Sequence, residues 1–242
     1  MTAHAGLARR IGTVARWPVG MAFTSWRYLW RITPLHRTDE GTPAGREWPL
    51  DPRAVDEGLQ RSSDGVGPLF HRRYAVDIAD AERSPDDLVS VLATDPGKAA
   101  PVEVAVFWKT RGREGQLRVG DEFLVRMPGP WDGPVRVVDR TPTSFRLATM
   151  RGHLEAGQIE FRARGEDGLL RFEIESWARS GDRLSALLYT RVRLIKEMQL
   201  HMWTCYCERI ASLARGRRVG GVGITTGHHA DAGGTTRSRP AA

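Results

Sequence analysis

The stretch from residue 182 to residue 215 decides the fold of this chain, and it runs DRLSALLYTRVRLIKEMQLHMWTCYCERIASLAR. Apolar residues recur in it at spacings of three and four, which is the period of one face of an α-helix. These positions are Leu184, Leu187, Leu188, Val192, Ile195, Met198, Met202, Tyr206, Ile210 and Leu213. Asp182 is a suitable N-cap and Gly216 a suitable stop, so the pattern predicts one helix over 182–215. At ~1.5 Å per residue this helix is about 50 Å long, which is enough to cross a whole sheet.

The segments before this helix alternate between apolar and polar residues, which is typical of strands with one buried face. Only one other helix is expected, over 85–94, because Ser84-Pro85-Asp86-Asp87 combines an N-cap, a first-turn proline and acids at the positive end of the helix dipole. The links between the later strands are of hairpin length, which favours antiparallel pairing. The predicted strands lie at 72–79, 102–109, 117–127, 135–138, 145–150, 159–164 and 171–178.

The order of strand, helix, six strands and long helix predicts an α+β helix-grip fold. In this fold a curved antiparallel β-sheet of about seven strands wraps around the long C-terminal helix, and the space between them forms a cavity for an apolar ligand. Residues 69–215 would form this domain. Before it we expect a basic aromatic arm over 1–46 and a linker over 47–68, and after it a disordered tail over 216–242, which is rich in Gly, Ser and Thr.

The positive charge of the chain lies mainly outside this predicted domain. The formal net charge is +7, but residues 1–46 hold 7 Arg against 2 acids and the tail holds 4 Arg against 1 acid, which leaves 25 bases against 26 acids between them. A nucleic-acid-binding domain normally concentrates bases on its folded surface to neutralise phosphates. No nucleic-acid partner is therefore expected.

The arm mixes Arg with aromatic residues in the stretch LARRIGTVARWPVGMAFTSWRYLWR, residues 7–31. Its longest uncharged run, 17–26, is about half of a membrane span and contains Pro18 and Gly20, so a transmembrane helix does not fit. Three interpretations are open: an arm that docks its aromatic residues on its own domain, a targeting peptide, or an interfacial segment. Contacts with an anionic membrane surface would come from Arg9, Arg10, Arg16, Trp17, Trp26, Arg27, Trp30 and Arg31. The expected location is the cytoplasm, either free or peripheral at the membrane.

Several residues in this order resemble a known family. They are Gly120-Asp121, the string Gly152-His153-x-Glu155-x-Gly157, the strand of Phe161, the run FEIESWAR that ends at Arg179, and Gln199 in the last helix. Over residues 66–215 the pattern is similar to the domain-of-unknown-function family nineteen-ninety, within the helix-grip superfamily of START lipid-transfer domains and birch-pollen-allergen-like proteins. Leu154 departs from the proline that is usual in the string. The resemblance implies a cavity-bearing fold without an established activity.

Strand parity indicates which polar side chains face the predicted cavity, because alternate residues of a strand share a face. A few polar groups on an apolar wall suit the orientation of a ligand carboxyl or hydroxyl. In the alternative interpretation Gly152 forms a bulge that places His153 and Glu155 in solvent, and Asp121 is a turn residue beside Gly120. The candidate ligand-binding residues are Asp121, Thr149, Arg151, His153, Glu155 and Ser176.

The favoured function is non-enzymatic binding or carriage of a hydrophobic small molecule or lipid. One alternative is a cyclase- or hydratase-like enzyme that uses His153 and Glu155 as acid and base, and another is a peripheral membrane protein that acts through its arm. No cofactor is expected. A metal site is not expected either, because His201 and Cys205 supply too few ligands, while Cys205 and Cys207 point apart on the predicted helix.

Overall fold

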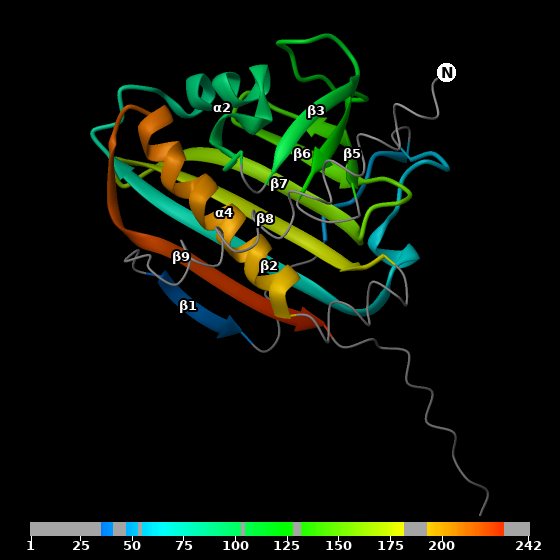
Figure 1. Cartoon of the computed structure of the whole chain (residues 1–242). Coiled ribbons are helices and arrows are strands. Elements are labelled where there is room, and N and C mark those ends of the chain that lie inside the picture. Colours follow the sequence, from blue (N-terminus) through cyan, green and yellow to red (C-terminus); the bar gives the residue numbers. More distant parts are fainter. Residues whose placement is uncertain are drawn as a thin grey trace, which may run out of the picture.

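The computed structural model describes residues 35–40, 47–52, 55–102, 105–127, 132–181 and 193–229. Its main element is a nine-stranded sheet with the strand order β1-β9-β2-β8-β7-β6-β5-β4-β3. Figure 1 shows this sheet curving around α4 (Arg193–Leu213), which lies across its concave face. The α+β class and the curved sheet around a C-terminal helix are confirmed, whereas the number of strands differs from the prediction. Residues 182–192 of the predicted long helix lie outside the described residues.

The central strands follow one another as antiparallel neighbours. Each consecutive pair from β3 to β8 is antiparallel, and β2 then pairs with β8, with Tyr74 opposite Ile174. Helix α2 (Pro85–Thr94) begins as predicted, because the Ser84 hydroxyl accepts a hydrogen bond from the Asp87 amide at 3.3 Å. The strands are β2 (Val66–Ala79), β3 (Val106–Arg111), β4 (Glu122–Arg126), β5 (Asp132–Arg140), β6 (Ser144–Thr149), β7 (Glu155–Glu166) and β8 (Leu169–Ser180). Two short 3-10 helices are η2 (Ser62–Asp64) and η3 (Pro96–Ala99).

The region after Gly216 corrects the prediction of a disordered tail. Residues Arg217–His229 form β9, which pairs antiparallel with β2 and parallel with β1 (Leu35–Glu40). The glycine-rich composition suggested disorder, but Val222 and Ile224 alternate along the strand and are buried in the core. Without β9, the long strand β2 would present an open edge with unpaired amides and carbonyls. Residues 230–242 lie outside the described residues.

The predicted linker is also ordered over much of its length. Residues 47–52 and 55–65, which we call the strap, pack on the convex face of the sheet. There Leu59 pairs with Met150 and joins Val138 and Ala148 in a small apolar cluster. The Gln158 side-chain amide donates to the Glu47 carboxylate at 3.0 Å and to the main-chain carbonyl of Trp48 at 2.9 Å. These contacts attach the strap to β5, β6 and β7.

The arm is described only where it forms β1, so its docking, targeting and membrane interpretations concern residues outside the described ones. Among the helices of the described residues, none combines the length and the apolar character that a membrane span requires.

The docking of β9 predicts a difference between two apolar positions of that strand. Ile224 is 4% exposed and Val219 is 38% exposed. We expect Ile224→Ala to lower the free energy of unfolding by about 2–4 kcal/mol, because a buried branched side chain is lost and a cavity is left. Val219→Ala, the matched control, should cost less than about 1 kcal/mol. Urea denaturation measures both values, and equally small losses would show that β9 is not part of the folded core.

Candidate functional site

The interior beneath α4 is solid along the C-terminal half of the helix. Tyr206 and Ile210 are fully buried there, as are Phe172 and Ile174 on the facing strand β8. The rings of Phe172 and Tyr206 stack at 6.1 Å between centroids, and the Tyr206 hydroxyl donates to the Pro96 carbonyl at 3.0 Å. Burial raises the pKa of Tyr206 well above its ordinary value, so the hydroxyl stays protonated. No accessible surface remains on these four side chains.

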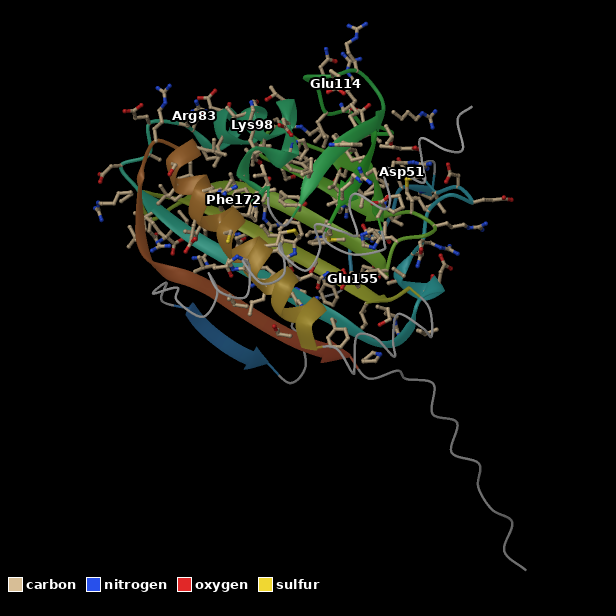
Figure 2. The ribbon with its side chains drawn as sticks, viewed as in Figure 1. Asp51, Arg83, Lys98, Glu114, Glu155 and Phe172 are labelled. Carbon is tan, nitrogen blue, oxygen red and sulfur yellow. The ribbon has the colours of Figure 1, made fainter. Side chains whose placement is uncertain are left out.

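Another part of the same interface, around residues 199–203 of α4, contains side chains that are less completely buried. Ile159 and Ser176 lie on the concave face of β7 and β8, and Leu200 and Trp203 lie on α4, yet all four are only half-buried. The three apolar ones pack against the main core without being enclosed by it. Figure 2 shows the two halves through Phe172, which lies toward one end of the interface, and Glu155, which lies toward the other.

A closed ring of three polar side chains joins the helix to the sheet in this half. The ring, here called the polar triad, consists of Arg72 on β2, Glu155 on β7 and Gln199 on α4. Arg72 Nη1 donates to Gln199 Oε1 at 3.0 Å, Gln199 Nε2 donates to Glu155 Oε2 at 2.9 Å, and Arg72 Nη1 lies 3.6 Å from Glu155 Oε1. The Arg72 and Glu155 side chains are only 13% and 16% exposed. Because each charge is paired, the triad is neutral overall and tolerates this burial.

Ser176 is placed next to the triad by the strand register. It lies opposite Arg72 in the β2–β8 pair and opposite Ile159 in the β7–β8 pair. It therefore shares the concave face with both, as its parity predicted. The Ser176 hydroxyl therefore lies across from Arg72, on the same face as the half-buried Ile159.

The string from Gly152 to Gly157 builds the turn that leads into β7. Gly152 has a φ of 93°, a conformation that favours glycine, and lies in the turn itself. Gly157 allows close pairing with β8, because a Cβ at this position would lie 2.0 Å from the Trp177 carbonyl oxygen. Its amide donates to the Thr149 hydroxyl at 2.9 Å. The two glycines therefore fix where β7 begins and which of its side chains point inward.

His153 has a structural position in this turn. Its Nδ1 lies 2.9 Å from the Glu155 amide nitrogen and 3.1 Å from the Glu155 carbonyl oxygen, so the ring is held by the main chain of that residue. A Cβ on Gly133 would lie 2.9 Å from His153 Nε2, so the ring occupies the space that this glycine leaves. Burial lowers the pKa of His153 below its ordinary value, although the nearby Glu155 charge opposes this effect. The imidazole is therefore neutral at neutral pH.

The predicted pairing of His153 with Glu155 takes a different form in the structure. In the described hydrogen bonds the imidazole contacts the main chain of Glu155, whereas the carboxylate of Glu155 contacts Gln199 and Arg72. The charge of Glu155 nevertheless acts on the imidazole, since it opposes the lowering of the His153 pKa. The solvent-exposed alternative does not fit either, because both residues are half-buried.

The remaining predicted residues lie outside this interface. Asp121 is a buried turn residue on the β3–β4 connection, where its Oδ2 accepts from Lys109 Nζ at 2.8 Å and from the Arg118 amide at 3.0 Å. Thr149 donates to the strap carbonyl of Gln60 at 2.8 Å. Arg151 is exposed in the turn rather than on the concave face, because β6 ends at Thr149 and strand parity does not continue through a turn.

The structure thus brings together Glu155 and Ser176 of the six predicted residues. It adds Arg72, which parity also indicates, since Arg72 is in phase with the buried Tyr74, Val76 and Ile78. Gln199 was noted only through the family resemblance, and no periodicity singles it out.

Comparison with known proteins finds a family that the middle of the chain resembles. Residues 100–209 match the model described as Domain of unknown function (DUF1990). The match covers less than half of the chain, so it shows a similarity to that family over these residues. The DUF1990 region includes Glu155, Ser176 and Gln199 but not Arg72, so one member of the polar triad comes from β2, outside the matched residues. No curated protein matches the chain.

Solved structures resemble the fold at low sequence identity. The di-domain ARO/CYC StfQ from the steffimycin biosynthetic pathway is 10% identical, with a TM-score of 0.46 over 64% of this chain and 52% of that chain. Ara h 8.0201 is 12% identical, with a TM-score of 0.39 over 59% of this chain and 99% of that one. The hypothetical protein jhp0584 from Helicobacter pylori is 8% identical, with a TM-score of 0.40 over 57% of this chain and 85% of that chain.

The lowered pKa of His153 predicts a pH dependence of stability. The unfolded imidazole has the ordinary pKa of 6.5 and binds a proton more readily than the buried one, so stability falls as the pH drops below this value, by up to about 1.4 kcal/mol per pH unit. His153→Asn keeps an acceptor for the Glu155 amide but does not titrate. We expect the difference in unfolding free energy between the unmodified chain and this variant to shrink by about 1 kcal/mol between pH 7.5 and 5.5. A difference that stays constant would contradict this account.

Proposed function

We propose that this chain binds an apolar small molecule or lipid between the concave face of the sheet and the first described turns of α4. The uneven packing of this interface carries the proposal. Protein interiors are normally filled to the density of organic crystals. Ile159, Leu200 and Trp203 keep accessible surface beside a core whose other half is solid, so they supply the apolar wall of a ligand site.

The polar triad determines the kind of polar group that this ligand carries. Arg72 is already balanced by Glu155, so a charged ligand group would add an unpaired charge in a half-buried place. A hydroxyl or carbonyl exchanges hydrogen bonds with Gln199, Arg72 or Ser176 without changing the charge balance. The proposed ligand therefore has an apolar body and a neutral polar group.

The proposed function is binding of the ligand without a chemical reaction, and the contacts of Glu155 and His153 support this form of it. The Glu155 carboxylate is engaged by Gln199 and lies near Arg72, and the acceptor nitrogen of His153 is engaged by a main-chain amide. A general acid and base would need these groups free to meet a substrate. Contact of the arm with an anionic membrane remains a prediction about residues 1–34.

The location of the site is tested by adding bulk on one face of the sheet at a time. Ser176→Phe places a ring in the proposed site, and Ala75→Phe places the same ring on the convex face of the neighbouring strand β2. With Nile red as a neutral apolar probe, we expect Ser176→Phe to weaken binding by about tenfold or more, because the new ring takes the ligand's space. Fluorescence titration measures this change, with Ala75→Phe close to the unmodified chain. Equal affinities in all three proteins would place the probe elsewhere.

The preferred polar group is tested with two ligands that differ only in their ends. Dodecanol carries a neutral hydroxyl and dodecanoate carries a charged carboxylate on the same apolar chain. We expect dodecanol to displace Nile red at a concentration about tenfold lower, because the neutral triad does not stabilise an added negative charge. Glu155→Gln removes the carboxylate that balances the Arg72 charge and should reverse this preference. An unchanged preference in that variant would show that the triad does not contact the ligand.

A further inference from the structure

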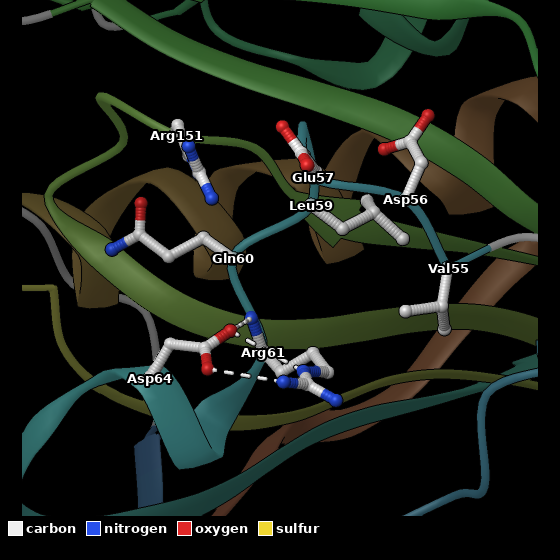
Figure 3. Close-up of a pocket in the computed structure, with 8 residues that line it drawn as sticks. All are labelled: Val55, Asp56, Glu57, Leu59, Gln60, Arg61, Asp64 and Arg151. Atoms are coloured by element: carbon white, nitrogen blue, oxygen red, sulfur yellow. Dashed lines mark hydrogen bonds and ion pairs between the residues drawn. The ribbon is translucent and has the colours of Figure 1, made fainter.

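A hollow lies outside the sheet–helix interface, between the strap and the turn that joins β6 to β7 (Figure 3). Its volume is about 610 Å³, which is in the range of sites for small organic molecules. The turn supplies Arg151, and the strap supplies the other lining residues. These are Val55, Asp56, Glu57, Leu59, Gln60, Arg61 and Asp64.

The two walls of this hollow are held together by main-chain hydrogen bonds. The Gln60 amide donates to the Thr149 carbonyl at 2.9 Å, and the Arg151 amide donates to the Gly58 carbonyl at 2.9 Å. The bridge between Leu59 and Met150 lies between these bonds. The hollow is therefore formed before a ligand arrives, which reduces the entropy that binding must overcome.

Two of the carboxylates in the hollow are neutralised by the protein itself. Asp64 accepts from the Arg61 guanidinium at 3.3 Å and from the Arg61 amide at 2.8 Å. Asp56 accepts from Arg136 Nη1 at 2.6 Å and from the Gly58 amide at 2.9 Å. These bonds lower the pKa of both carboxyls, so both are ionised at neutral pH and each is paired with a guanidinium, that of Arg136 being shared with Glu122.

One group of each charge remains available for a ligand. Among the described residues, the Arg151 guanidinium and the Glu57 carboxylate make no hydrogen bond or ion pair that would engage them. Figure 3 shows both side chains reaching toward the same side of the hollow, with Gln60 beside Arg151. Leu59, which is buried, and Val55, which is half-buried, add apolar surface to the lining.

We propose that this hollow binds a small organic zwitterion of the amino-acid type. Its carboxylate pairs with Arg151, whose planar guanidinium suits two parallel hydrogen bonds to a carboxylate. Its ammonium group pairs with Glu57, and its apolar side chain contacts Val55 and Leu59. A zwitterion pairs with both the Arg151 guanidinium and the Glu57 carboxylate, and it leaves the net charge of the hollow unchanged. A simple inorganic anion would engage Arg151 alone and would leave most of the volume empty.

Three related probes separate the two charged contacts. Leucine carries both charges, N-acetyl-leucine lacks the ammonium group, and leucinamide lacks the carboxylate. In isothermal titration calorimetry with the full chain, we expect leucine to bind at least about fivefold more tightly than either derivative, because each derivative loses one charge-assisted hydrogen bond. Equal affinities for the three probes, or no saturable binding of leucine below about 10 mM, would overturn the proposal.

Substitutions in the hollow assign each contact to one residue. Arg151→Gln should weaken leucine binding by about fivefold or more and leave leucinamide unchanged, whereas Glu57→Gln should weaken leucine and leave N-acetyl-leucine unchanged. Arg113→Gln and Glu114→Gln are matched controls on the exposed β3–β4 loop, which Figure 2 shows away from the strap through the labelled Glu114. All four positions are exposed, so the thermal midpoint should stay the same. Equal losses of leucine binding in the controls and in the hollow variants would contradict the assignment.

Discussion

The burial of α4 against the concave face of the sheet is the interaction on which the rest of the structure depends. The concave face is apolar and would be exposed to water without the helix, whereas the convex face is lined by charges. On the convex face Arg162 lies 3.3 Å from both Glu173 and Glu175. Burial acts to raise the pKa of Glu175, but the hydrogen bond from His71, at 2.7 Å, and the charge of Arg73 lower it on balance. The two faces thus differ enough in chemistry that the helix has only one place to pack.

The contacts between α4 and the sheet are apolar at one end of the helix and polar toward the other. The candidate site lies where they become polar. At one end Tyr206 and Phe172 stack in a dry core. At the other end the polar triad holds the helix to β2 and β7, because Gln199 bonds to side chains from both strands. Hydrogen bonds fix a position without filling volume, whereas close-packed apolar side chains do both. The helix is therefore held to the sheet by hydrogen bonds around Gln199 and by close packing around Tyr206.

The sequence predicts those features that follow from periodicity within one segment. Alternation predicted the antiparallel strands and placed Ser176 on the concave face, and cap chemistry placed the start of α2 at Ser84. Glu155 also lies on the concave face, but its prediction continued the phase of Phe145 and Leu147 across the turn at Gly152, where that phase does not hold. The tail was misjudged because its glycine-rich composition outweighed the short alternation of Val222 and Ile224, and because the edge of β2 that β9 covers lies in another segment. Arg151 was misplaced because the turn at Gly152 ends the alternation on which the prediction rested. Each error concerns a relation between segments rather than a pattern inside one.

The string from Gly152 to Gly157 shows why a recognisable motif need not be catalytic. Its residues shape the backbone. Gly152 makes the turn, the His153 ring forms a hydrogen bond with the Glu155 amide, and Gly157 permits close pairing with β8. The result is that Arg151 points outward toward the strap and Glu155 points inward toward α4, although only three residues separate them. One turn therefore supplies Arg151 to the hollow beside the strap and Glu155 to the polar triad, and its residues hold those two side chains in opposite directions.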